Sequence, residues 1–226
     1  LHPPLSSSCS FNSRNGDSMN YDHVFPKADI ISLILARLIQ LRTSDSILLL
    51  HPDAEIGMPT TSCGIFSSKD ILNQLNLEPF PNSLNISSNS LRSEWFEKHL
   101  AIILANNGAY ISTRATFNQT SPTSGKITGS TSISGEITFN YLHNISIPES
   151  YSHSWYCKIH MNNPPPEITF FSKRSDNSFE SWSKNDIIIP NTFETRIGMG
   201  SSQSPNTIDI NMELAQEYLD HHLNTN

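Results

Sequence analysis

Charged side chains are scarce in this sequence, and no part of it carries a dense cluster of one sign. Lys and Arg number 14 and Asp and Glu 21, for a net charge of −7 and a charged fraction of 15%. The basic residues cluster only in the adjacent pair Lys173 and Arg174, whereas the residues from Asp176 onward hold eight acids against two bases. An acidic terminus repels phosphates and anionic lipids, so the charge pattern argues against a nucleic-acid or membrane-surface partner.

Cysteines and long apolar runs are also scarce. The three cysteines, Cys9, Cys63 and Cys157, are odd in number and widely spaced, which is not a disulfide framework. No run of 18 apolar residues exists, and the first 25 residues lack a basic segment followed by an apolar one. We therefore expect no membrane span and no signal peptide, which favours an intracellular location.

Glycine motifs for nucleotides and nucleophiles are missing. The segment Gly198-Met199-Gly200 lacks a third glycine and a strand-to-helix context, and no Gly-x-x-x-x-Gly-Lys-Ser/Thr occurs. The serine-rich run from Gly129 to Gly135 contains no Gly-x-Ser-x-Gly, so the sharp turn that exposes a catalytic serine is absent. We assign no cofactor.

Two groups of metal-binding residue types fail on geometry. Cys157 and His160 are three residues apart on an expected strand, so their side chains leave opposite faces. Glu213, Glu217 and His221 share one face of the last expected helix, which is typical of a solvated polar surface. We assign no metal site.

Helical periodicity dominates the first half of the chain. Apolar residues recur at helical spacing from Ile30 to Leu41, on nearly all sides, which predicts a buried helix. The pattern also predicts an interior strand at 47–50, a short helix from Ser67 or Ser68 through Leu75, and a second long helix from Leu91 to Asn106.

Period-two alternation dominates the second half. It predicts strands within 109–117, 126–142, 155–161, 168–171, 187–189 and 193–197. Because these strands are joined by loops and not by helices, we expect an antiparallel sheet and an α+β fold. The expected architecture is a helical N-terminal half, an antiparallel β-sheet in the middle and C-terminal half, and a closing amphipathic helix at 209–223. We expect residues 1–25 to be a flexible N-terminal segment and 26–226 a single domain with a sub-boundary at 78–89.

With no catalytic signature, the sequence favours a non-enzymatic structural or protein-interaction component. Edge strands with few lysines do little to prevent pairing, so a self-associating component, for instance of a virion shell or matrix, is the leading hypothesis. Its partner would be itself or another protein subunit. The contact residues best supported lie on the closing helix, and packing on the chain's own sheet is their competing explanation: Met212, Ala215, Leu219 and Leu223.

Two alternatives remain. A small hydrolase-like enzyme would use His51 with Asp53 or Glu55 as general base and Cys63 as nucleophile, because polar residues that come directly after an apolar strand often form active sites. An adaptor subunit would dock its acidic C-terminal helix on a basic partner, with binding that weakens as salt rises.

Overall fold

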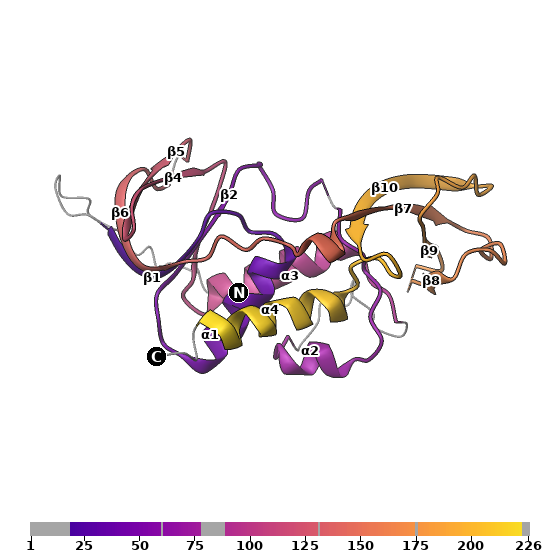
Figure 1. Cartoon of the computed structure of the whole chain (residues 1–226), viewed down its shortest axis with the longest axis horizontal. Coiled ribbons are helices and arrows are strands. Elements are labelled where there is room, and N and C mark those ends of the chain that lie inside the picture. The colour runs from indigo at the N-terminus through magenta and orange to yellow at the C-terminus, as the bar shows by residue number, and fades with distance from the viewer. Residues whose placement is uncertain (1–18, 60, 78–88, 131, 175, 223–226) are drawn as a thin grey trace, which may run out of the picture.

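Two β-sheets with helices packed between and below them make up the molecule (Figure 1). The computed structural model describes residues 19–59, 61–77, 89–130, 132–174 and 176–222. Leu223 and nearly all of the sub-boundary expected at 78–89 lie outside the described residues. Residues 19–25, which we expected to be part of a flexible N-terminal segment, form the first strand.

The larger sheet has six strands in the order β3-β2-β1-β6-β5-β4. Its strands are β1 (Met19–Phe25), β2 (Ile47–His51), β3 (Tyr110–Thr113), β4 (Thr116–Ser121), β5 (Ser124–Thr128) and β6 (Gly135–Leu142). Strand β1 pairs in parallel with both β2 and β6, and β2 pairs in parallel with β3. Strands β4, β5 and β6 form an antiparallel meander at the other end of the sheet.

Strand β2 and the end of β1 are buried on both faces, which explains their apolar sequences. Phe25 and Leu49 face the core shared with the helices, whereas Val24, Leu48 and Leu50 face a second apolar cluster under the meander. Every residue of β2 is buried. A strand covered on both sides reads as a continuous apolar run and not as an alternation.

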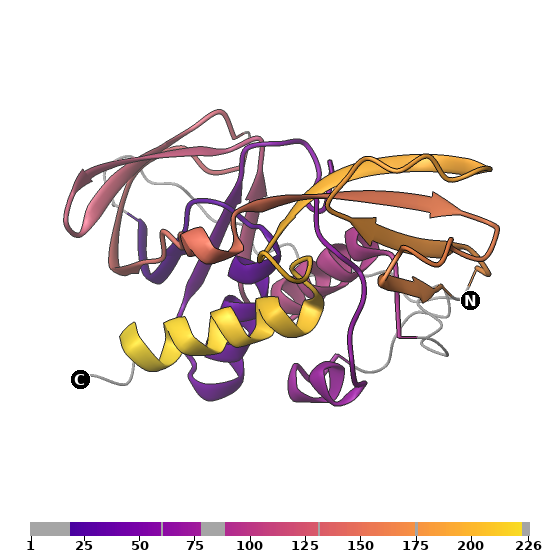
Figure 2. The same cartoon turned by 45° about the vertical axis from the view of Figure 1, so that its right-hand side comes forward.

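Four α-helices cover one face of this sheet (Figures 1 and 2). They are α1 (Ile30–Arg42), α2 (Asp70–Gln74), α3 (Ser93–Asn106) and α4 (Ile208–His222), and a 3-10 turn, η2, spans Glu149–Tyr151. Helix α1 contacts both α3 and α4, which is why it is apolar on nearly all sides. No helix in the described part of the chain is long and apolar enough to cross a membrane.

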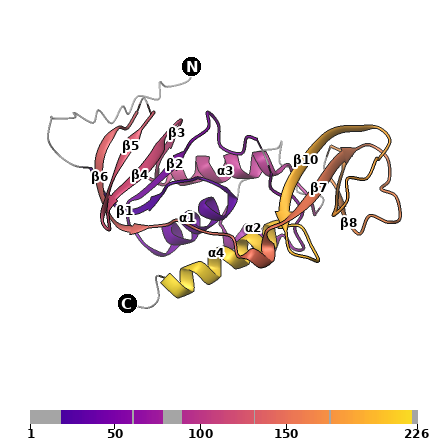
Figure 3. The same ribbon diagram turned by 45° about the horizontal axis from the view of Figure 1, so that its top comes forward.

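The smaller sheet is antiparallel and lies beyond the helices, at the right of Figure 3. Its strands, in the order β10-β7-β9-β8, are β7 (His153–His160), β8 (Phe170–Lys173), β9 (Phe179–Ser183) and β10 (Thr192–Gly200). Arg196 on β10 ties this sheet to the start of α3, because its Nη2 donates to Oε2 of Glu94 at 3.2 Å and its Nη1 donates to Ser93 at 3.1 Å.

The predicted α+β class with a helical N-terminal half is wrong. The fold is a mixed α/β fold, and its six-stranded sheet contains parallel strands β1, β2, β3 and β6. The prediction failed because it included the residues of β1 in a flexible segment, and it therefore contained no β1-α1-β2 unit. The expected strand at 187–189 is also absent, and Ile188 there is 93% exposed.

Candidate functional site

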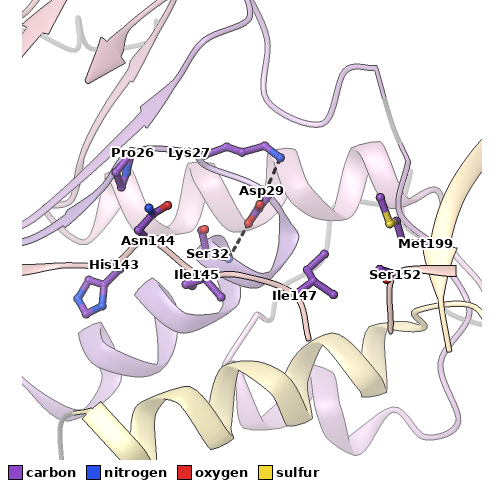
Figure 4. A pocket seen from close by; sticks show the side chains of 10 residues that line it. All are labelled: Pro26, Lys27, Asp29, Ser32, His143, Asn144, Ile145, Ile147, Ser152 and Met199. Carbon is purple, nitrogen blue, oxygen red and sulfur yellow. Dashed lines mark hydrogen bonds and ion pairs between the residues drawn. The ribbon is translucent and has the colours of Figure 1, made fainter. Parts of the chain in front are cut away.

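A crevice opens where the carboxyl ends of β1 and β6 lie side by side (Figure 4). The chain leaves β1 through α1 toward β2 on one side, while β6 pairs on the other side, so this is the point where the order of parallel strands reverses. Open α/β sheets bind ligands at such points. The cavity measures about 330 Å³, and its lining comes from the segments that follow β1 and β6, the start of α1, the residue after η2 and β10: Pro26, Lys27, Asp29, Ser32, His143, Asn144, Ile145, Ile147, Ser152 and Met199.

Asp29 shapes the inner wall of the crevice. It is the N-cap of α1, and its Oδ1 accepts a hydrogen bond from the backbone N–H of Ser32 at 3.0 Å (Figure 4). Its Oδ2 lies 3.5 Å from Nζ of Lys27, whose side chain is 67% exposed. The start of α1 therefore carries a carboxylate of the protein itself, which is the charge that a helix N-terminus favours.

A smaller recess of about 90 Å³ continues from the crevice. Both cavities share Lys27, Asp29, Ile147 and Met199 in their linings. The recess is otherwise lined by Ile30, Ile31, Thr61, Ser62, Asn206 and Asn211. Asn206 is buried, and its Oδ1 has no hydrogen-bond partner among the described residues.

Glu97 of α3 lies behind the recess. Its carboxylate accepts a hydrogen bond from the side chain of Ser62, which lines the recess, and its Oε1 has no partner in the described part of the chain. Burial raises the pKa of Glu97 to about 7, and the nearby charges of Asp29 and Glu94 add to the shift while Lys27 opposes it. A carboxyl group with this pKa exchanges its proton near neutral pH.

A chain of hydrogen bonds reaches the other end of the crevice. Oδ2 of Asp45 lies 3.1 Å from Nε2 of His23, and Nδ1 of His23 lies 2.9 Å from Nε2 of His143. His143 also stacks on Phe25, with ring centroids 4.4 Å apart. The Asp45 carboxylate accepts from His23 Nε2–H, and in the neutral tautomer of His23 this leaves Nδ1 to accept from His143 Nε2–H, so the contacts orient both rings.

The four residues of the hydrolase hypothesis do not gather in one cleft. Nε2 of His51, at the end of β2, lies 3.8 Å from Oδ2 of Asp53, but Glu55 instead pairs with Nζ of Lys98 at 2.6 Å. Cys63 instead packs against the smaller sheet, in an apolar cluster with Trp155, Cys157, Ile159 and Trp182.

The environment of Cys63 also opposes a role as nucleophile. Cys63 is buried with Cys157 and Trp182 beside the carboxylate of Glu180. Burial and the Glu180 charge raise its pKa well above the ordinary value, so the thiol stays protonated.

The residues expected to contact a partner are part of the main core. Met212, Ala215 and Leu219 are buried in the core, where α4 packs on helix α1, whereas the competing explanation had placed them against the chain's own sheet. Leu223 lies outside the described residues. The described residues contain no group of three or more His, Cys, Asp or Glu able to hold a metal ion.

Comparison of the fold with solved structures finds flavoenzymes. No protein-family model matches the chain, and no curated protein matches it in sequence. A geranylgeranyl bacteriochlorophyll reductase-like protein from Thermoplasma acidophilum superimposes with a TM-score of 0.54 at 12% identity over 92% of this chain and 63% of that one. A myxobacterial FAD-dependent chondrochloren halogenase gives 0.51 at 11% identity, over 91% of this chain and 56% of the halogenase. An L-α-glycerophosphate oxidase from Mycoplasma pneumoniae with FAD bound gives a TM-score of 0.53 at 8% identity, over 89% of this chain and 94% of the oxidase.

These similarities correct the functional hypothesis. The fold is similar to that of an FAD-dependent halogenase and of an oxidase with FAD bound, so the prediction of a self-assembling structural component such as a virion shell or matrix protein is wrong. The hydrolase-like and adaptor alternatives find no support in this fold either. The chain spans less than two thirds of the first two of these proteins.

The turn where such folds hold a dinucleotide does not fit FAD in this chain. The usual fingerprint, Gly-x-Gly-x-x-Gly after the first strand, lets the backbone approach the pyrophosphate. Here the segment after β1 reads Pro26-Lys27-Ala28-Asp29-Ile30-Ile31, so Pro, Ala and Ile stand at the three glycine positions. Ala28 and Ile31 are buried in the main core.

Two further features of the same site disfavour the dinucleotide. The Asp29 carboxylate already accepts from the backbone N–H of Ser32 at the start of α1, where its negative charge would repel a pyrophosphate. The fold usually holds the ribose with an acid about 20 residues farther on. In this chain β2 ends at His51, and Asp53 beyond it is 59% exposed and turned toward His51.

Proposed function

We propose that this chain is a small-molecule-binding protein with the fold of FAD-dependent oxidoreductases, whose ligand lies in the crevice between the ends of β1 and β6. The observation that supports this most is the cavity of about 330 Å³ at the strand-order reversal, lined from both sheets. In this proposal no dinucleotide binds at the start of α1, because the Asp29 carboxylate accepts the hydrogen bond from Ser32 N–H that a phosphate group would otherwise accept.

The crevice residues suit an organic molecule of modest size. Ile145, Ile147 and Met199 supply apolar contact, whereas Ser32, Asn144 and Ser152 supply polar groups. Six of the ten lining residues are polar or charged, so the crevice suits a ligand that combines polar groups with an apolar part.

A matched pair of methionine variants tests this proposal. Met199 lines both cavities and is 49% exposed, whereas Met161 is 54% exposed and lines neither. We expect Met199→Trp to fill the crevice and to abolish the thermal stabilisation that small aromatic compounds give the wild-type protein, while Met161→Trp leaves it unchanged. Equal stabilisation of the two variants would place the binding site elsewhere.

A flavin-dependent oxidoreductase is the second candidate, favoured by the match to the FAD-bound oxidase over 89% of this chain. Titration of the purified protein with FAD, followed by flavin fluorescence and visible absorbance, separates the two candidates. We expect no change on titration and no flavin absorbance in the protein as purified. Stoichiometric FAD would overturn the first proposal in favour of the second.

A further inference from the structure

We infer that the crevice ligand carries a protonated amine, held in the small recess by oxygen acceptors of Asn206, Asn211 and Asp29. This inference rests on the proposed ligand site and specifies the chemistry of its inner end. The site would thus select a charge opposite to that of a pyrophosphate.

The amides that line the recess present acceptors to it. Asn206 is 7% exposed, and its Oδ1 has no hydrogen-bond partner among the described residues. Asn211 is 2% exposed, and its Nδ2 already donates to the backbone oxygens of Asn206 and Thr207, at 3.1 and 2.8 Å. Its Nδ2 is therefore occupied, and its amide oxygen is the group it would offer to a ligand. Buried acceptors without donors are costly, so a donor that enters the recess gains from both.

The charges around the recess add to this preference. Asp29 lines it, and Glu97 lies behind it with Oε1 unpartnered among the described residues. Glu94 is neutralised by Arg196 and Arg92, whose Nη2 atoms lie 3.2 and 2.6 Å from its carboxylate oxygens.

Lys27 is the one cation among the described residues that line the recess. Its Nζ is already 3.5 Å from Asp29, and its side chain is two-thirds exposed at the outer edge. The recess therefore presents amide and carboxylate oxygens as acceptors, and an ammonium group held there would share Asp29 with Lys27.

The sizes of the two cavities indicate how the ligand lies. The recess of about 90 Å³ accommodates a small head group, whereas the crevice of about 330 Å³ accommodates a larger body. Ile147 and Met199 line both cavities, so they would contact the ligand where its head group joins its larger body. The expected ligand is a primary amine with an apolar or aromatic body.

Three probes of one shape and different charge test the inference: benzylamine, benzyl alcohol and benzoate, each titrated into the full chain and followed by calorimetry and thermal unfolding. We expect benzylamine to bind at least about tenfold more tightly than benzoate, with benzyl alcohol between them. We expect Asn206→Leu and Asp29→Asn each to weaken benzylamine about fivefold or more. Asn162→Leu, at an exposed position beyond β7, is the control and leaves binding unchanged.

The outcomes separate this inference from the proposed function. Benzoate binding as tightly as benzylamine, or benzylamine binding that survives both recess variants, would overturn the amine while the crevice site stands. Stabilisation by none of the three probes, in the wild-type protein or in Met161→Trp, would overturn the site and the amine together. Asp29→Asn keeps an oxygen that caps α1, and the thermal unfolding curve of each variant confirms that it is folded.

Discussion

At the scale of single residues, Glu97 links the stability of the molecule to pH. Its pKa in the folded protein is about 7, against an ordinary value of 4.5. Between these values the folded state holds a proton that the unfolded state has lost, so the stability from this group is complete below 4.5 and is lost as the pH rises toward 7. At about 1.4 kcal/mol per pKa unit, the loss is roughly 3 kcal/mol.

Glu97→Gln removes this ionisation and tests the assignment. We expect the free energy of unfolding of the variant, relative to the wild type, to rise by roughly 2 kcal/mol between pH 5 and pH 8 in urea titrations. The comparison between pH values cancels any cost of the substitution itself. Glu136→Gln, at an exposed position of β6, serves as control. A difference that does not change with pH would show that Glu97 is ionised throughout.

Glu180 is the most completely satisfied buried charge in the described chain. It is fully buried and accepts hydrogen bonds from the backbone N–H of Gly64, from Nε1 of Trp182 and from Nε and Nη2 of Arg174, between 2.8 and 3.0 Å. These bonds attach the loop around Gly64 to the smaller sheet. Removing one partner of such a pair leaves an uncompensated charge.

We therefore expect Arg174→Met to lower the free energy of unfolding by about 3–5 kcal/mol in urea. The matched control is Lys158→Met, because Lys158 pairs at 2.5 Å with Asp186, which is 60% exposed. We expect the loss of this ion pair to lower the free energy of unfolding by about 0–1 kcal/mol. Similar losses in the two variants would mean that the Glu180 cluster contributes no more than a surface pair.

At the scale of elements, the sequence allowed the long helices to be predicted but not the strand that organises the sheet. Helix α1 is recognisable because its apolar residues repeat through 13 positions. Strand β1 is not, because Met19–Phe25 includes Asn20, Asp22 and His23 among its apolar residues. It becomes a strand through pairing with β2 and β6, and these partners are distant in sequence.

The N-cap of α1 is a feature whose contribution can be separated from the charge of its side chain. Asp29→Ala removes the oxygen that accepts from Ser32 N–H, and we expect a loss of about 1 kcal/mol in the free energy of unfolding. Asp29→Asn keeps an acceptor and should cost only a few tenths of a kcal/mol. Thermal and urea unfolding of the two variants would measure the difference. Equal losses in both would show that the negative charge at the helix dipole matters more than the cap.

At the scale of the whole molecule, the candidate site could not be predicted because its residues come from distant segments. Pro26 and His143 meet only because β1 and β6 pair in parallel, and Met199 arrives from the other sheet. Single-sequence patterns contain no such information. The absence of a glycine-rich turn is visible in the sequence, but only the pairing of β1 with β2 and β6 shows that the residues after Phe25 form the turn between the first strand and helix α1.

The crevice is lined from both sheets, so their attachment to each other also matters for binding. Arg196 on β10 is 6% exposed and bonds to Ser93 and Glu94 at the start of α3. We expect the wild-type protein to unfold in urea in one transition, with far-ultraviolet circular dichroism and tryptophan fluorescence coinciding. In Arg196→Met, the fluorescence of Trp155 and Trp182 in the smaller sheet should change at lower urea than the circular dichroism, because the tie to α3 is lost. Coincident curves in the variant would show that the apolar contacts between the sheets and the helices suffice to make unfolding cooperative.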